Sequence, residues 1–530
     1  MKLNYIIFLL GSFLIIFGSN FFFGSPEKEK VKISENQEFQ DEFTVKKESF
    51  IVSDEKIINE EIKNKNNFLK IENNLFKGEI SLVGGYISNL ELKNFYVKPS
   101  SNIKSNVFSD REYLSKIIFK AKDFEINTNL LFNVIKNSKN EILLSSKVSG
   151  KEIILRYLIE PNDYSIEREI LVLNKSSDNF IFRIFEESLG EIDVTEYYDF
   201  SYFYGDDVEK IDSLPSEPIK EIEDISWYGF SKKYFLGAVL FNENLEKTVK
   251  YEKKTTGLMR TVLSHKTINL LSGGQYRQSS TIFLGPKDYK ILSNYGSLER
   301  AHDLGWFHWL ASPLEKFLNF SNQYIKNYGL AIILITILIR ILFLPLTVKS
   351  MMSMKKMQSK MALLKPKLDE IKEKFKDDKQ TQNQEIMNLY SKEGMNPLSS
   401  LSGCLPMLIQ LPVFVALYNV LLYSLDLRHT SFLWINDLSS PENLFDIFGI
   451  PFRALPLIMG ISWYITQKMT PPNPGADEFQ TKIFQYMPIL FTVMFWGLPS
   501  GLILYWTVSN IISIFQQIYI NQKFKKMQGA

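Results

Sequence analysis

The sequence predicts a membrane protein with an all-α core of five spans, a first span that anchors the N-terminus, and an all-β, sandwich-like domain between them. Two observations predict this fold class. Apolar runs long enough to cross a bilayer gather in residues 325–523, with one more in residues 1–24. Residues 68–300 instead show the period-two alternation of β-strands. The apolar residues, 45% of the 530-residue chain, are therefore concentrated in particular segments.

The run at residues 329–348 (GLAIILITILIRILFLPLTV) is the most informative span because it contains Arg340. A helix of about 20 residues crosses the hydrocarbon core, and an arginine at its centre costs about 2.5–3.5 kcal/mol. We expect Arg340 to face a wet cavity or a polar partner. A snorkelling or structurally paired arginine is the alternative. Thr336 lies one turn earlier on the same helical face, which indicates a polar stripe.

The composition argues against several classes of function. Lys and Arg (61) nearly balance Asp and Glu (59), so the protein has no large net positive charge that would favour binding of nucleic acid. The sequence contains neither a GxxxxGK[ST] phosphate loop nor a GxSxG nucleophile elbow. The only cysteine, Cys404, lies in an apolar segment and is interpreted as a packing residue. The four histidines show no metal-ligand spacing. We predict no enzyme activity, no cofactor and no metal.

Residues 1–24 carry Lys2 before an apolar run, which is typical of an export signal or a signal anchor. The run is long and no A-x-A cleavage pattern follows it, which favours an uncleaved transmembrane span over a cleaved signal. Residues 25–67 are rich in Glu, Lys, Asn and Ser with few aromatics, so they predict a flexible tether.

The β domain is predicted at residues 68–300. Alternation is clearest in residues 77–92, 152–159 and 165–173, and Gly84-Gly85 is one of the turn signals between strands. Because the domain follows an export segment, we expect it outside the cytoplasm. The sequence identifies no convergent sugar or peptide site, which favours a packing scaffold.

An amphipathic helix is predicted at residues 301–324. Trp306, Phe307 and Trp309 are among its apolar residues, with Glu315 and Lys316 opposite. This pattern favours a helix in the outer membrane interface, with aromatic rings at the headgroups. The alternative is a buried helix of the β domain.

A cytoplasmic helical hairpin is predicted at residues 349–400, with a kink near Pro366. Apolar residues spaced alternately by three and four predict one packing seam. They are Met354, Met357, Met361, Leu364, Leu368, Ile371 and Phe375. Flexible methionines beside a membrane also suit transient contact with varied apolar segments, and the proposed substrate contacts are Met351, Met354, Met357 and Met361.

Four further spans complete the predicted core, at residues 403–423, 454–467, 483–498 and 501–520. Basic residues then fall on one side of the membrane, including Lys2, the hairpin, Lys468 and Lys523. The positive-inside rule places both termini in the cytoplasm and the β domain outside.

The fourth and fifth spans are short, and the 14 residues of the fourth make about 21 Å of helix. This pair of spans is therefore predicted either to thin the bilayer locally or not to cross it fully. A short basic tail follows at residues 524–530.

Several segments resemble the YidC family of membrane-protein insertases, in its Gram-negative form. They are GCLPMLIQLPVFVALYNVL at residues 403–421, the Arg340 span, and LPSGLILYWTVSNIISIFQQ at residues 498–517. This resemblance covers about residues 303–523. A weaker one includes SLVGGYISNLEL and FLGPKDY in the β domain, and it implies a supersandwich-like fold for that domain.

The resemblance implies a protein that inserts and helps to fold newly made inner-membrane proteins, alone or with the Sec translocon. It implies a hydrophilic groove lined by Arg340, Thr336, Gln467, Tyr505 and Trp506. The implied partners are nascent membrane proteins, the Sec translocon, lipid, and the ribosome through cytoplasmic loops and the basic tail, with no small-molecule substrate. The sequence departs from the family where NPLSS at residues 396–400 replaces the usual NPLGGC pattern.

Two other functions remain open from the sequence. A small-solute secondary transporter would also place a charge at membrane depth, but it predicts inverted repeats with broken helices, which the five spans do not show. An envelope enzyme or binding protein would depend on the β domain instead of the spans.

Overall fold

The computed structural model describes residues 67–98, 102–121, 130–193, 198–211, 220–223, 225–241, 247–253, 257–393, 405–469 and 478–528. The predicted first span, nearly all of the tether, the hairpin exit at residues 394–400 and Cys404 lie outside these ranges. The chain divides into two compact units, with the boundary between His302 and Asp303.

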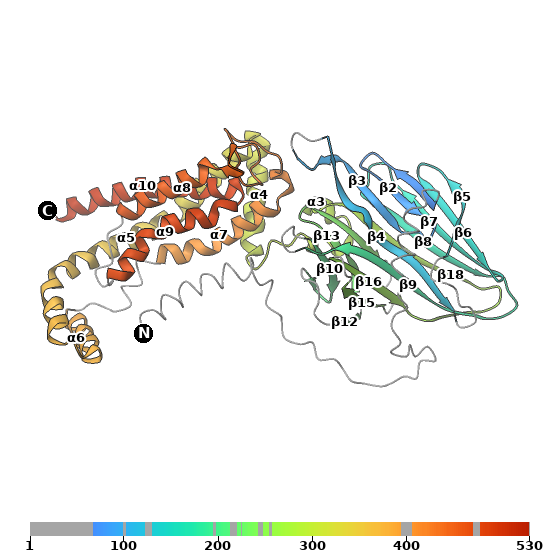
Figure 1. Cartoon of the computed structure of the whole chain (residues 1–530), viewed down its shortest axis with the longest axis horizontal. Coiled ribbons are helices and arrows are strands. Elements are labelled where there is room, and N and C mark those ends of the chain that lie inside the picture. The colour runs from blue at the N-terminus through green and yellow to red at the C-terminus, as the bar shows by residue number, and fades with distance from the viewer. Residues whose placement is uncertain are drawn as a thin grey trace. The chain divides into compact units, whose positions relative to one another are not determined.

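The first unit is built from two antiparallel sheets, each with nine strands among the described residues (Figure 1). The first sheet runs in the order β1 (Phe68–Glu72), β2 (Phe76–Ser81), β3 (Ile87–Tyr96), β4 (Lys104–Ala121), β9 (Phe180–Glu191), β16 (Leu258–His265), β15 (Lys247–Lys253) and β12 (Lys220–Glu223), with β17 (Ile268–Leu270) also paired to β9. The second runs β11 (Asp207–Ile211), β10 (Asp199–Tyr204), β13 (Ile225–Ser231), β14 (Phe235–Phe241), β18 (Gln275–Pro286), β8 (Ser165–Asn174), β7 (Lys151–Ile159), β6 (Glu141–Val148) and β5 (Asn133–Asn137).

The alternating segments of the sequence form the expected strands, which confirms the prediction of a large β domain. Residues 77–92 contribute to β2 and β3, while the other two segments form β7 and β8. Along β7 and β8, fully buried residues alternate with partly exposed ones over much of each strand, as expected for one face turned to a core. Gly84 and Gly85 turn the chain at φ of 76° and 66°, a region that favours glycine.

A buried ion pair joins the two sheets. Arg168 of β8 donates to the Glu186 carboxylate of β9 at 2.8 Å, and both side chains are fully buried. His265 Nε2 lies 2.9 Å from the other oxygen of Glu186. Burial alone would raise the pKa of Glu186, but the Arg168 charge and the hydrogen bonds to the carboxylate outweigh burial and lower this pKa.

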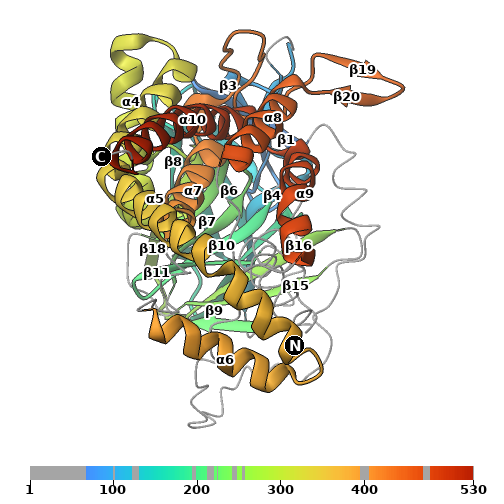
Figure 2. The same cartoon turned by 90° about the vertical axis from the view of Figure 1, so that its left-hand side faces the viewer.

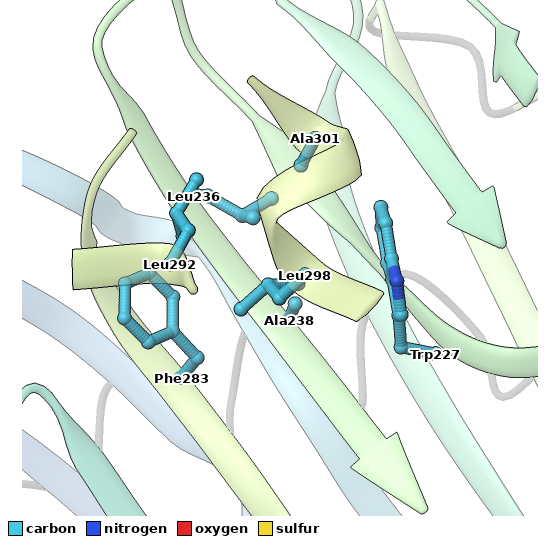
Figure 3. Close-up of a cluster of buried hydrophobic side chains, with 7 residues drawn as sticks. All are labelled: Trp227, Leu236, Ala238, Phe283, Leu292, Leu298 and Ala301. Atoms are coloured by element: carbon cyan, nitrogen blue, oxygen red, sulfur yellow. The ribbon is translucent and has the colours of Figure 1, made fainter. Parts of the chain in front are cut away.

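Two short helices, α3 (Tyr289–Leu292) and η2 (Gly296–Ala301), end the first unit. Figure 3 shows Leu292, Leu298 and Ala301 from these helices beside strand residues of the second sheet, among them Trp227 and Phe283. This cluster packs α3 and η2, the last elements of the first unit, onto the second sheet.

The second unit is mainly helical. Its elements are α4 (His308–Ile325), α5 (Tyr328–Lys374), α6 (Lys379–Lys392), α7 (Leu405–Tyr423), η4 (Leu425–Leu427), β19 (Phe445–Ile447), β20 (Ile450–Phe452), α8 (Ala454–Met469), α9 (Glu478–Met494), η5 (Phe495–Gly497) and α10 (Ser500–Gln528). Among the described residues, α5 and α10 are long and apolar enough to cross a membrane, and residues 410–423 of α7 form a shorter apolar helix. Helices α8 and α9 have 16 and 17 residues, so both are longer than predicted.

Helix α5 continues without interruption from the Arg340 span into the first arm of the hairpin, through Pro345 and Pro366. Figure 1 shows its far part turning away from the other helices to lie beside α6. Asp378 caps α6 by accepting hydrogen bonds from the backbone N–H groups of Gln380 and Thr381. The two arms pack through Met361, Leu364 and Leu368 of α5, and the partly buried residues around these three are Met357 of α5 and Ile386, Leu389 and Tyr390 of α6.

Helix α4 belongs to the second unit and packs against α5 and α7, so the alternative of a buried helix of the β domain is wrong. It lies crosswise to the long helices of this unit (Figure 1). Trp306, just before the helix, and Trp309 and Tyr324 within it are at least 70% exposed. This arrangement suits a helix that lies along a membrane surface.

Candidate functional site

The site is centred on Arg340, in the first half of α5. Its Nε donates to Ser509 Oγ of α10 at 2.9 Å, and an N–H of its second terminal nitrogen donates to the same hydroxyl. No carboxylate in the described part of the chain forms an ion pair with Arg340. The guanidinium is therefore held by a neutral hydroxyl, and no acidic side chain among the described residues balances its positive charge.

Tyr505 extends this polar connection to a third helix. It lies one turn before Ser509 on α10 and is 2% exposed. Its hydroxyl accepts a hydrogen bond from Gln410 Nε2 of α7. Side chains of α5, α10 and α7 thus form a polar layer inside a bundle whose helices are otherwise largely apolar. Interhelical hydrogen bonds of this kind fix helix rotation in a membrane bundle.

The other predicted site residues have different surroundings. Thr336 is fully buried, and its hydroxyl donates to the Ile332 carbonyl of its own helix at 2.6 Å. Trp506 lies in an aromatic cluster with Phe414, Trp463, Phe491 and Phe495. Gln467 is half-buried in the last turn of α8. The structure therefore brings Arg340 and Tyr505 into one polar layer, and it places Trp506 in an apolar cluster.

The loop between α7 and α8 closes one end of the bundle. Backbone N–H groups of Ser500 and Gly501, at the start of α10, donate to the carbonyls of Ser440 and Leu438 at 2.9 and 2.8 Å. At the start of α5, a Cβ added to Gly329 would lie 2.1 Å from the ring of Phe432. This close packing covers the N-terminal ends of both helices that meet at Arg340.

One side of α5 is exposed along its apolar part. The exposed residues are Leu334, Ile337, Leu338, Ile341, Leu342, Leu344 and Leu346. Arg340 is partly buried and lies between this surface and the buried face that includes Ile335 and Ile339. Exposed leucine and isoleucine in such numbers are typical of a lipid-facing surface.

The hairpin methionines fall into two groups. Met361 is 6% exposed and belongs to the seam between α5 and α6, and Met357 packs against it. Met351 and Met354 are half-buried and lie outside this seam cluster. Only the second pair is free of the contacts that hold the hairpin together.

The described residues contain no group of three or more His, Cys, Asp or Glu side chains that could hold a metal ion.

Ser509 and Gln410 bond directly to Arg340 and Tyr505. The sequence places both among the polar span residues that could line a groove with Arg340, but it does not single them out as site residues. A weak signal was present, because Ser509 follows Tyr505 by four residues and so shares its helical face. Many polar residues occur in these spans, however, and only the packing of α5, α7 and α10 identifies the pairs.

Two family models together match most of the chain. Residues 320–527 match the model described as 60Kd inner membrane protein, and residues 69–317 match the YidC periplasmic domain. The chain belongs to the YidC family of membrane protein insertases. The inner membrane is the location named for the family, and the β domain matches its periplasmic domain.

Relatives named membrane protein insertase YidC support the same assignment. The protein from Geotalea daltonii is 36% identical over 464 residues, covering 83% of each chain. The one from Pelobacter propionicus is 43% identical over 335 residues, covering 61% of this chain and 59% of the relative, so this match spans about three fifths of that relative.

Two solved structures resemble the YidC-family chain less closely. A crystal structure of an active YidC insertase with its first transmembrane domain resolved has a TM-score of 0.36 and 19% identity, covering 85% of this chain and 92% of that one. A galactose mutarotase related enzyme from Lactobacillus acidophilus has a TM-score of 0.30 and 14% identity, covering 41% and 97%. Both scores are below 0.5, so neither likeness supports a conclusion about function.

Proposed function

We propose that this YidC-family protein inserts newly made membrane proteins by drawing a polar segment of the substrate toward Arg340. The observation that carries the proposal is the uncompensated charge of Arg340, which is held by Ser509 and by no carboxylate among the described residues. Inside a membrane the effective dielectric constant is low, so this charge attracts an acidic tail more strongly than it would in water.

The apolar segment of the substrate supplies the driving force. As the polar tail moves inward past Arg340, the following apolar residues exchange water for lipid along the exposed faces of the bundle. Each buried CH₂ group contributes about 0.8 kcal/mol, so a transmembrane segment can offset the transfer of a short polar tail. This mechanism requires no nucleotide. Closure of the outer end by the loop between α7 and α8 would keep the polar path open only from the cytoplasm.

The proposal includes a topology and a set of partners. We place both termini in the cytoplasm, with a first span and five core spans. The lysine-rich hairpin and the basic C-terminal end of α10 are the proposed contacts for the ribosome. Met351 and Met354 are the proposed hairpin contacts for nascent chains, because Met357 and Met361 are engaged in the seam. We also propose that the protein acts alone or beside the Sec translocon.

Protease protection in proteoliposomes tests the charge mechanism. An opposite charge about 6 Å away, at an effective dielectric constant of about 20, contributes about 3 kcal/mol, or roughly 100-fold in equilibrium. We expect Arg340→Ala to reduce insertion of a substrate with an acidic tail by up to about 100-fold. Arg340→Lys, which keeps the charge, should retain much of the insertion.

Two controls sharpen this experiment. Lys349→Ala removes an exposed positive charge from the same helix and should leave insertion nearly unchanged. A substrate whose tail is neutral should be much less sensitive to Arg340→Ala. Undiminished insertion of the acidic tail by Arg340→Ala would refute charge recruitment. A small-solute transporter, by contrast, would show solute flux and no protected tail.

A further inference from the structure

An apolar β-hairpin in the loop between α7 and α8 has no partner within the described part of the chain. Strands β19 and β20 pair antiparallel, with Phe445 opposite Phe452 and Ile447 opposite Ile450. Phe448 and Gly449 join them, at φ of 51° and 81°. A two-residue turn with positive φ at both positions favours Asn-Gly, and a bulky aromatic there is conformationally unfavourable. The geometry of the turn therefore gives no reason for a phenylalanine at position 448.

The hairpin exposes most of its apolar side chains. Phe448 is 102% exposed, Ile450 is 64% exposed and Phe445 is 55% exposed. Asp446 is the one charged residue within the two strands and their turn. Two-stranded hairpins are marginally stable in water, and exposed apolar patches mark interaction surfaces. These properties favour an apolar environment around the tip.

The base of the hairpin, in contrast, is firmly attached to the bundle. Glu442 is buried, and its carboxylate accepts hydrogen bonds from the backbone N–H of Leu455 at 2.7 Å and from Trp434 Nε1 at 2.6 Å. Leu455 lies in the first turn of α8. The rings of Phe445 and Phe452 stack at 4.9 Å between centroids. The hairpin is thus held at a fixed height, at the N-terminal end of α8.

The hairpin extends sideways from the bundle. Figure 2, which looks at the ends of several long helices, shows β19 and β20 projecting laterally beyond α8 and α9. These two helices carry exposed apolar residues such as Ile461, Ile489 and Val493, which are typical of a lipid-facing surface. The hairpin therefore continues that surface at the end of the bundle where α8 begins.

We propose that the β19–β20 hairpin inserts its tip into the outer-leaflet interface of the membrane that surrounds α8 and α9. Its occupant is lipid, at the boundary between headgroups and acyl chains, where exposed aromatic rings are favoured. Phe448 and Ile450 enter this boundary, while Glu442 holds the base to α8. The hairpin then acts as an anchor that sets the height of the outer ends of α8 and α9. The inference rests on the membrane location and the topology proposed above for the bundle, and it is independent of charge recruitment by Arg340.

Spin labelling of the full chain in phosphatidylethanolamine and phosphatidylglycerol vesicles tests this anchor. Cys404→Ser removes the only cysteine, and Phe448→Cys then introduces one labelling position at the tip. We expect collisions of the label with oxygen, which concentrates in lipid, to exceed those with a water-soluble nickel chelate. Leu363→Cys in the same background is the matched control, because Leu363 is 80% exposed on the lysine-rich part of α5. The control should favour the nickel chelate.

Two results would overturn the proposal. A label at position 448 that favours the nickel chelate as strongly as the control would place the tip in water. A label shielded from both reagents would show that protein, from a second copy or another chain, covers the tip in place of lipid. An Arg340→Ala variant should give the same collision pattern as the parent, which separates failure of the anchor from failure of the proposed insertion mechanism.

Discussion

Substitution of Ser509 by alanine isolates the contact that holds Arg340 in place. The hydroxyl accepts two hydrogen bonds from one guanidinium, through Nε at 2.9 Å and through a terminal nitrogen. Alanine keeps the helix and removes the hydroxyl, which also hydrogen-bonds to Tyr505. A hydrogen bond to a charged group contributes about 1.5–3 kcal/mol, so Ser509→Ala should lower the free energy of unfolding by about that amount, or roughly 10- to 150-fold in the equilibrium constant.

The measurement is reversible unfolding of the full chain in mixed micelles of dodecyl maltoside and sodium dodecyl sulfate. Ser513→Ala is the matched control, because Ser513 lies one turn later on α10 and its hydroxyl donates only to the Ser509 backbone carbonyl, at 3.0 Å. The control should change the free energy of unfolding by no more than about 0.5 kcal/mol. Insertion activity should survive Ser509→Ala, since the charge remains. Equal destabilisation by the two variants would refute the role assigned to Ser509.

Three further predictions follow from the packing and from the buried charges. Gly329→Ala should lower the free energy of unfolding in the same assay by about 1–3 kcal/mol, because its Cβ meets the Phe432 ring, and the same substitution should cost much less when made in a Phe432→Ala background. Arg168→Met should lower the free energy of unfolding by about 3–5 kcal/mol, because Glu186 is left buried without its partner. Adding Glu186→Leu should restore most of this stability, and calorimetry measures both changes. The folded-state pKa of the Glu186 carboxyl is lowered from its usual value of 4.5. The stability that the charged carboxylate contributes is therefore present above pH 4.5 and is lost as the pH falls below that value. Acid should thus destabilise the parent protein more than the variant that carries both Arg168→Met and Glu186→Leu. Met361→Ala should lower the thermal stability of the α5–α6 hairpin, measured by limited proteolysis, with a cost of about 2–5 kcal/mol for a buried methionine.

Much of the architecture could be predicted because each local pattern agrees with its final environment. The alternation at residues 152–159 became a strand with one buried face, and the three-and-four spacing around Met361 became a packed seam. The order of strands could not be predicted in this way. Strand β9, for example, pairs with both β4 and β16, which lie far from it in sequence. Such pairings depend on contacts across the whole domain.

Part of the candidate site could be predicted from a local pattern, and the rest depends on how the helices pack. A charge in an apolar helix identifies Arg340 from the sequence alone, because the cost of burial is large. Its partner depends on how α5 and α10 are rotated against each other, and a polar residue such as Ser509 is unremarkable by itself. The adjacent residues Tyr505 and Trp506 were both expected near Arg340. They point about 100° apart on the helix, and only Tyr505 joins the polar layer.

Photocrosslinking beside Arg340 tests the central claim most directly. A photoreactive residue at position 337 or 344 would lie on the helical face of Arg340, three residues before it or four after it, whereas one at position 342 lies on the opposite face. All three positions are exposed in the structure, so the substitutions should be tolerated. With ribosome-bound nascent chains that carry an acidic tail, we predict crosslinks to the tail from positions 337 and 344, and only lipid adducts from position 342. Equal crosslinking from all three positions, or none from the Arg340 face, would contradict the account.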